Sequence, residues 1–143
     1  MKRPVCSLLF LPWLAFGCVN ADETWREIDV VVTVESAAPG PVFVDFHHAE
    51  VGEGLLAHPL GLIESVDVDG PGGFLHPLLY PAHAGEGLVV YAWQDLDGDG
   101  LLCAPGTEHE LAGLTTARVD GPFDAVAVVR PSVPCAGAER LIP

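Results

Sequence analysis

Short apolar runs separated by turn residues recur along the chain from about residue 28 onward. Residues 42–47 show the clearest alternation, because Val42, Val44 and Phe46 fall on one face of a strand while the opposite face becomes polar at Asp45. Most other runs are rich in β-branched residues, which favour strands. The pattern predicts strands at residues 28–34, 42–47, 62–68, 74–80, 88–94, 115–119 and 125–130.

Turn signals close most of these runs at intervals of about ten residues. Prolines and glycines at 39–41, 69–73 and 120–122 favour turns. Residues 49–61 have no clear period and are predicted to form a long connection, and Pro77 restricts its strand to a sheet edge or a bulge. The chain is therefore predicted to be all-β, a single antiparallel β-sandwich of about seven strands.

The first residues have the composition of a signal peptide. Lys2 and Arg3 precede an apolar run at residues 5–16, and small residues follow it. This run of about a dozen residues is well short of the roughly 20 that an α-helix needs to cross a bilayer, so cleavage is preferred to a retained anchor. A signal peptide is predicted at residues 1–17, with 1–21 as the alternative.

The first cleavage site rests on Ala15-Phe16-Gly17-Cys18, which resembles the lipobox of bacterial lipoproteins. The resemblance implies that Cys18 is acylated and becomes the mature N-terminus, which anchors the protein to a membrane. It also implies the outer membrane, because Val19 takes the place of the Asp that in this class retains proteins at the inner membrane. The second site, after Ala21, would instead release a soluble periplasmic or secreted protein.

Two cysteines, Cys103 and Cys135, fall inside the predicted domain. An oxidising compartment favours their pairing, and the alternative is two separate buried thiols. A bridge between them would close a loop of about 32 residues and stabilise the fold by roughly 3–4 kcal/mol on the chain-entropy estimate. A disulfide between the two residues is therefore predicted.

Removal of residues 1–17 from the 143 of the chain leaves 126, which suits a tether at 18–27 and one β-sandwich domain at 28–143. It also leaves four basic residues against twenty acidic ones, so the net charge changes from −14 to −16 with histidines neutral. Such a field repels nucleic acid and anionic lipid head groups, and it favours cations or a basic protein partner. A solvated acidic surface that keeps the protein soluble is the alternative.

One segment carries candidate chemistry, because an apolar strand runs directly into Asp95, Asp97 and Asp99, and Gly100 follows. Carboxylates on alternate residues can curl around Ca²⁺, which takes six to eight oxygen ligands. The opening resembles the first half of an EF-hand loop, but Gly106 stands where the bidentate Glu belongs. The missing oxygens must therefore come from elsewhere.

The far arm of the same loop offers Glu108 and Glu110 as sources of those oxygens. Ca²⁺ is the predicted cofactor, and its candidate ligands are Asp95, Asp97, Asp99 and Glu108. The alternative is a plain hairpin loop, in which aspartate side chains accept hydrogen bonds from their own backbone and ion binding plays no part.

The strand followed by Asp-x-Asp-x-Asp-Gly resembles bacterial transthyretin-like and carboxypeptidase-regulatory-like β-sandwiches. Those domains often read Tyr-x-Val-x-Ala-x-x-Asp-x-Asp/Asn-x-Asp/Asn-Gly, and the present chain has Leu88 where the aromatic residue usually stands. The resemblance covers about a sixth of the domain and implies an immunoglobulin/transthyretin-like fold without implying an activity. The matching residues are Val90, Ala92, Asp95, Asp97, Asp99 and Gly100.

Histidines and nucleophiles give little support for an enzyme. His47 and His48 are neighbours in a predicted strand, so they face opposite ways and cannot easily hold one ion. His58, His76, His83 and His109 are predicted to be surface imidazoles. No serine lies in a Gly-x-Ser-x-Gly turn. The predicted function is a non-enzymatic binding or structural module at the cell envelope. The alternatives are a secreted metal-dependent enzyme that uses the histidines and the aspartate loop, and a soluble acidic periplasmic partner of a basic protein.

Overall fold

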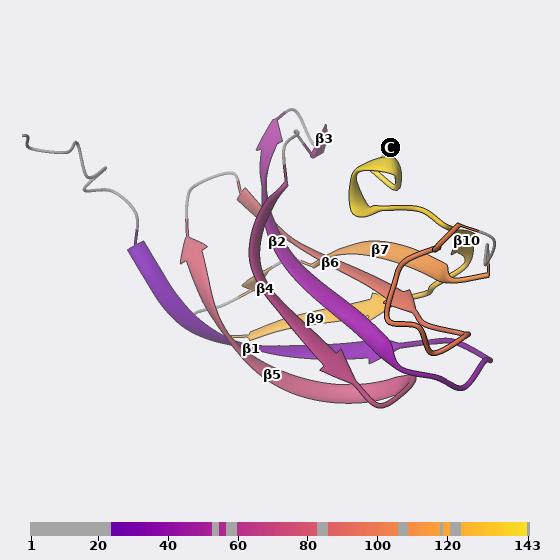
Figure 1. Cartoon of the computed structure of the whole chain (residues 1–143). Helices are drawn as coiled ribbons and strands as arrows, with labels where there is room; N and C mark the ends of the chain where they lie inside the picture. The colour runs from indigo at the N-terminus through magenta and orange to yellow at the C-terminus, as the bar shows by residue number, and fades with distance from the viewer. Residues whose placement is uncertain are drawn as a thin grey trace, which may run out of the picture.

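The computed structural model describes residues 24–52, 55–56, 60–82, 86–105, 109–117, 119–120 and 124–142 (Figure 1). The predicted signal peptide, Cys18 and Glu108 lie outside these residues. The elements are β1 (Thr24–Val34), β2 (Val42–Gly52), β3 (Leu55–Leu56), β4 (Gly61–Val68), β5 (Gly72–Ala82), β6 (Glu86–Gln94), β7 (Leu111–Ala117), β8 (Val119–Asp120), β9 (Asp124–Val129), β10 (Val133–Pro134) and the short 3₁₀ helix η1 (Ala138–Arg140).

The strands form two sheets that face each other, as Figure 1 shows. The first sheet has the order β5-β1-β9-β8, and the second has the order β10-β7-β6-β2, with β3 and β4 both paired to β2. Neighbouring strands are antiparallel except β1 and β9, which are parallel. The prediction of an all-β sandwich is confirmed, and the seven longer strands of the described residues correspond to the seven predicted ones.

The core lies between the two sheets and is built from alternate residues of each strand. Val42, Val44 and Phe46, the alternating set expected from the sequence, are completely buried. Val30 and Val32 meet them from β1 in the facing sheet. Further buried side chains come from β5, β6, β7 and β9, namely Leu78, Tyr80, Leu88, Val90, Ala92, Ala117, Ala125, Ala127 and Val129.

Several strand boundaries differ from the predicted ones because pairing with a neighbour extends or moves them. β1 begins at Thr24 and not at Ile28, since its first residues pair with β5 as far as Ala82. β7 begins at Leu111, opposite Gln94 of β6, and so starts before the predicted strand. β2 also continues into the region predicted as a connection. Pro77 lies on β5, at the edge of its sheet, as predicted.

The C-terminal segment packs on the outer face of the second sheet, away from β1 and β9 (Figure 1). The Tyr91 hydroxyl donates a hydrogen bond to the backbone oxygen of Ala136 at 2.9 Å. Phe43 and Trp93 stack on the same face, with ring centroids 4.2 Å apart. A second apolar cluster therefore exists outside the main core, and its members are Tyr91, Trp93, Ala112, Leu114, Ala136, Ala138 and Leu141.

The predicted disulfide between Cys103 and Cys135 is confirmed, with the two Cα atoms 5.5 Å apart. It joins the loop between β6 and β7 to the segment after β10. Both cysteines have a positive φ, 55° for Cys103 and 49° for Cys135. This left-handed conformation costs a residue with a side chain about 1–2 kcal/mol, so the bridge lies between two strained backbone positions.

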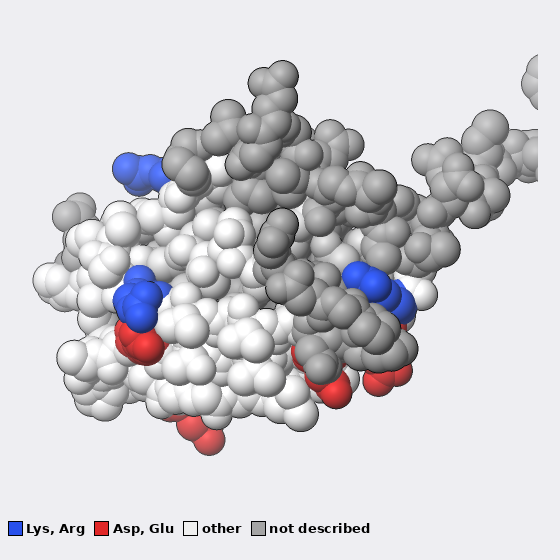
Figure 2. Space-filling view, turned by 180° about the vertical axis from the view of Figure 1, so that it is seen from behind, with Lys and Arg blue, Asp and Glu red and all other residues white. Residues whose placement is uncertain are grey.

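Figure 2 shows the molecule from behind, and acidic side chains form no large cluster on the described part of that face. Charged side chains are scattered there singly or in small groups over a surface that is mostly neither acidic nor basic (Figure 2). Within the described ranges, no helix combines the length and the apolar composition that a membrane span requires.

Candidate functional site

The end of β6 fixes the point at which the aspartate loop begins. Gln94 and Asp95 are both buried. The Gln94 side chain accepts a hydrogen bond from Ser36 Oγ at 2.6 Å and donates one to the backbone oxygen of Ala38 at 2.7 Å. The backbone N–H of Asp95 donates to Pro41 O at 3.0 Å. The segment after β1 therefore holds the start of the loop in place.

Asp95 organises the loop through both of its carboxylate oxygens. Oδ1 accepts a hydrogen bond from the backbone N–H of Gly98 at 2.6 Å, and Oδ2 accepts one from the N–H of Gly100 at 2.9 Å. Gly98 and Gly100 have φ values of 80° and 73°, which glycine adopts readily. The glycines thus allow the backbone to wrap around the buried carboxylate.

Asp97 and Asp99 extend the same pattern at the surface. Asp97 Oδ1 accepts from the N–H of Asp99 at 3.1 Å, and Asp99 Oδ1 accepts from the N–H of Leu101 at 2.7 Å. One carboxylate oxygen from each of Asp95, Asp97 and Asp99 lies within 4.8 Å of the other two. The structure therefore brings the three predicted ligands together, one of them buried and two exposed.

Burial and hydrogen bonding act in opposite directions on the Asp95 carboxyl. Burial favours the neutral acid and would raise its pKa, but the backbone N–H groups of Gly100, Gly98 and Asp97 stabilise the carboxylate. The hydrogen bonds prevail, and the pKa of Asp95 lies below its usual value. Asp95 is therefore a carboxylate at neutral pH, the form that a metal ion requires.

The loop can hold a hard cation, and it can equally serve as a turn. Each carboxylate oxygen has two lone pairs, so an oxygen that accepts one N–H can also face an ion. Three carboxylates supply part of the six to eight oxygens that Ca²⁺ takes. The same hydrogen bonds explain aspartates and glycines in a plain turn. Glu108, the predicted fourth ligand, lies outside the described residues.

Glu110, considered as an alternative ligand, does not join the aspartate cluster. It is completely buried, and a carboxylate oxygen lies within 4.8 Å of both disulfide sulfurs. Its Oε2 accepts a hydrogen bond from the N–H of Cys103 at 3.0 Å, and its backbone oxygen accepts one from the N–H of Cys135 at 3.1 Å. The sequence offered no sign of this burial, because it depends on the path of the C-terminal segment.

His47 lies on the face of β2 that the sequence predicted to become polar, and the residue is nevertheless only 9% exposed. His47 lies within electrostatic reach of Asp45 and of Glu139 in the C-terminal segment. His76 is half-buried, and its Nε2 lies 3.2 Å from a Glu64 carboxylate oxygen, whereas His109 is exposed. His58 and His83 lie outside the described residues.

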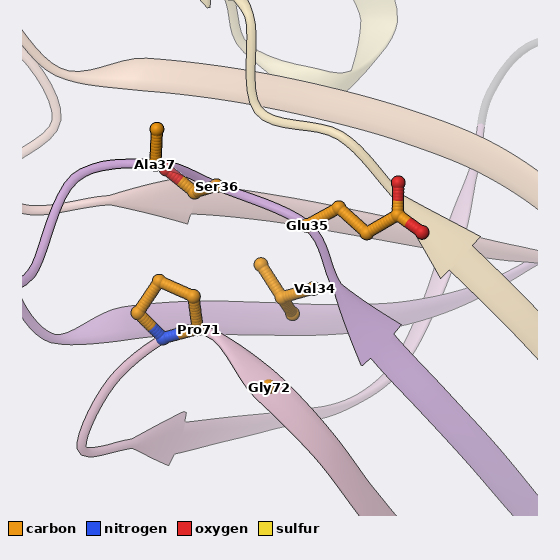
Figure 3. Close-up of a pocket in the computed structure, with 6 residues that line it drawn as sticks. All are labelled: Val34, Glu35, Ser36, Ala37, Pro71 and Gly72. Carbon is orange, nitrogen blue, oxygen red and sulfur yellow. The ribbon is translucent and has the colours of Figure 1, made fainter.

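An open pocket of about 580 Å³ lies where the end of β1 meets the start of β5. Figure 3 shows the Glu35 carboxylate pointing away from Pro71 on the opposite wall. That carboxylate pairs with Arg130 Nε at 2.6 Å, and Ser36 donates its hydroxyl to Gln94. Since these polar groups are already engaged with neighbouring side chains, the pocket offers little chemistry to a ligand.

The fold and the loop together define a β-sandwich with an acidic, cation-competent loop. Comparison of the chain with protein-family models, with curated proteins and with solved structures finds no match.

Proposed function

We propose that the chain is an exported β-sandwich module of transthyretin-like type, anchored by a lipid on Cys18 at the cell envelope, with a loop stabilised by Ca²⁺. The role is binding or structural and not catalytic. The observation that carries the calcium site is the cluster of Asp95, Asp97 and Asp99, whose carboxylate oxygens lie within 4.8 Å of one another. Carboxylates in this arrangement match the ligands that Ca²⁺ prefers.

Preorganisation supports the proposed ion site. The strand end and the segment after β1 fix Asp95, and the glycine turns bring Asp97 and Asp99 to the same side. An ion in the loop would reduce the mutual repulsion of three close negative charges. The high acidic content of the chain would also raise the local concentration of cations.

An exposed apolar surface supports a binding role. The outer face of the first sheet exposes Val31, which lies opposite Leu75 on β5 and opposite Val126 on β9. Trp25 and Leu79 are also more than half exposed. Exposed apolar side chains that neighbour one another on one face are typical of contact surfaces.

Calorimetric titration of the purified protein with Ca²⁺, together with thermal unfolding, tests the ion site. Ca²⁺ at about 100 times its dissociation constant would raise the free energy of unfolding by about 2.7 kcal/mol. The double variant Asp97→Asn/Asp99→Asn should lose both the heat of binding and the stabilisation. These two side chains are exposed, so the fold should tolerate the change.

The matched control is Asp67→Asn/Asp69→Asn, which removes the same charge from exposed positions at the end of β4. It should keep the affinity for Ca²⁺. Absence of binding at millimolar Ca²⁺ with an unchanged melting temperature would contradict the site, because weak extracellular-type sites bind in that range. If both double variants lost Ca²⁺ binding equally, binding would depend on the net charge and not on the aspartate loop, and this result would also contradict the proposed site.

A further inference from the structure

Glu110 has a buried carboxylate oxygen beside the disulfide that no described residue satisfies. The residue is completely buried, and its Oε1 has no hydrogen-bond partner in the described part of the chain. A carboxylate oxygen of Glu110 lies within 4.8 Å of the sulfurs of Cys103 and Cys135. Burial of a carboxylate costs free energy unless the group is paired or coordinates a metal. Oε1 of Glu110 is therefore a candidate ligand atom for a cation.

We propose that Cys103, Cys135 and Glu110 form a binding site for a thiophilic divalent cation, Zn²⁺ being the chemical type, when the disulfide is reduced. Two thiolates and one carboxylate are established zinc ligands, with Zn–S near 2.3 Å and Zn–O near 2.0–2.2 Å. Ligand atoms at those distances from one ion lie less than 4.8 Å apart, and one ligand atom from each of these three residues already lies within 4.8 Å of the other two. A water molecule completes a four-coordinate site.

The arrangement of the three ligands does not depend on the sulfur–sulfur bond alone. The backbone N–H of Cys103 donates to Glu110 Oε2, and the N–H of Cys135 donates to the Glu110 backbone oxygen. The positive φ of both cysteines places strain in the backbone next to the bridge. Reduction removes a constraint on these strained residues while the two hydrogen bonds still hold them beside Glu110.

The disulfide and the ion exclude each other, because the thiolates that bind the cation are the atoms joined in the bridge. A dithiol reductant transfers two electrons and two protons to the sulfurs and leaves as its own disulfide. The cation then replaces the two thiol protons, which pass to solvent. The soft sulfur ligands distinguish this site from the all-oxygen aspartate loop and make it independent of the Ca²⁺ proposal.

The test uses the protein without a histidine tag, reduced anaerobically with a phosphine, which takes the oxygen of water as the disulfide opens. Co²⁺ serves as the spectroscopic probe, since thiolate ligation gives a charge-transfer band, and Zn²⁺ is then used to displace it. The reduced protein should bind one ion per chain with this band, and the oxidised protein should show no band. Glu110→Gln should weaken binding by about tenfold or more, the loss seen even for partners that only support a ligand.

Glu27→Gln is the matched control, because Glu27 is exposed on β1, and it should bind like the unchanged protein. Cys103→Ser/Cys135→Ser should give no charge-transfer band. The comparison of oxidised and reduced protein needs no variant, so it decides the outcome even where Glu110→Gln fails to fold. No band in the reduced protein, loss of its β-sheet circular dichroism on reduction, or unchanged affinity in folded Glu110→Gln would overturn the proposal.

Discussion

His47 is a buried base whose protonation the folded protein resists. Neither ring nitrogen has a hydrogen-bond partner among the described residues. Burial lowers the pKa of His47 below 6.5, Asp45 and Glu139 act to raise it, and His48 acts to lower it. Burial prevails, so the folded state holds His47 neutral at pH values where the unfolded chain already binds a proton.

Acid should therefore destabilise the protein through His47. The unfolded histidine takes up its proton as the pH falls through 6.5, while the folded one does so only at lower pH, so the free energy of unfolding decreases over this window. In His47→Gln this contribution should disappear, and the loss of stability between neutral pH and about pH 5 should be smaller. Chemical unfolding at a series of pH values measures the difference.

His109→Gln supplies the comparison, because His109 is exposed. That variant should lose stability with falling pH as steeply as the unchanged protein does. If His47→Gln and the unchanged protein have parallel pH profiles, the buried imidazole does not account for acid sensitivity.

At the level of single residues, the sequence predicted groups of side chains that are close together along the chain. It did not predict burial that depends on residues far away in the sequence. Asp95, Asp97 and Asp99 were predictable as a group, because alternate spacing before a glycine fixes their positions within a few residues of chain. The burial of Glu110 and of His47 was not predictable in this way. The backbone of Glu110 is hydrogen-bonded to Cys135, and His47 lies within electrostatic reach of Glu139. Both partners belong to the segment that follows β10, far away in the sequence, so the neighbouring residues of Glu110 and His47 give no sign of them.

At the level of elements, β7 lies close to the chain that leaves β9 at the position of Gly113. A Cβ added at Gly113 would lie 2.9 Å from the nitrogen of Pro131 and closer still to the backbone oxygen of Arg130. Both are backbone atoms, which cannot rotate away. Gly113→Ala should therefore lower the free energy of unfolding by about 1–3 kcal/mol, the usual cost of overpacking, as measured by chemical denaturation.

Gly137→Ala makes the same chemical change where a Cβ would meet nothing within 4 Å and where φ is −64°. Its stability should stay within about 0.5 kcal/mol of the unchanged protein, or rise slightly because alanine restricts the unfolded chain. If Gly113→Ala is as well tolerated as Gly137→Ala, the close approach of β7 to the chain after β9 is wrong.

Alternation along single strands predicted most elements, whereas their ends depended on partners. The apolar face of β2 could be identified from sequence because one side of the strand is buried and the other turns polar. The early start of β1 could not be identified from the sequence, because Trp25 and Glu27 face solvent and only their backbone pairs with β5. The C-terminal segment has little periodicity, and its position follows from the disulfide and from packing on Tyr91.

For the whole molecule, the start of β1 limits how far an anchored domain could stand from a bilayer. Five residues separate Cys18 from Thr24, where β1 begins. An extended chain gains at most about 3.6 Å per residue, so a lipid on Cys18 would keep the sandwich within about 20 Å of the surface. Trp25, the second residue of β1, is an amphipathic residue of the kind that lies at membrane interfaces.

The mass of the mature N-terminal peptide tests the anchor. We expect a peptide that begins at Cys18 and carries acyl chains, and Cys18→Ser should abolish the acylation. Cys103→Ser is the control, since it should leave the N-terminal peptide unchanged. A peptide that begins at Asp22 without lipid would contradict the anchor while leaving export itself intact.

The parallel pairing of β1 with β9 determines when the first sheet can be completed. β1 is an inner strand, and its residues pair with positions 95 further along the chain, as Asp29 does with Asp124. During synthesis from the N-terminus, this edge of β1 stays unpaired until β9, near the end of the chain, has also been made. For a chain exported as proposed, passage through the membrane would precede closure of the sheet. Such distant pairings place folding among the slower of small domains.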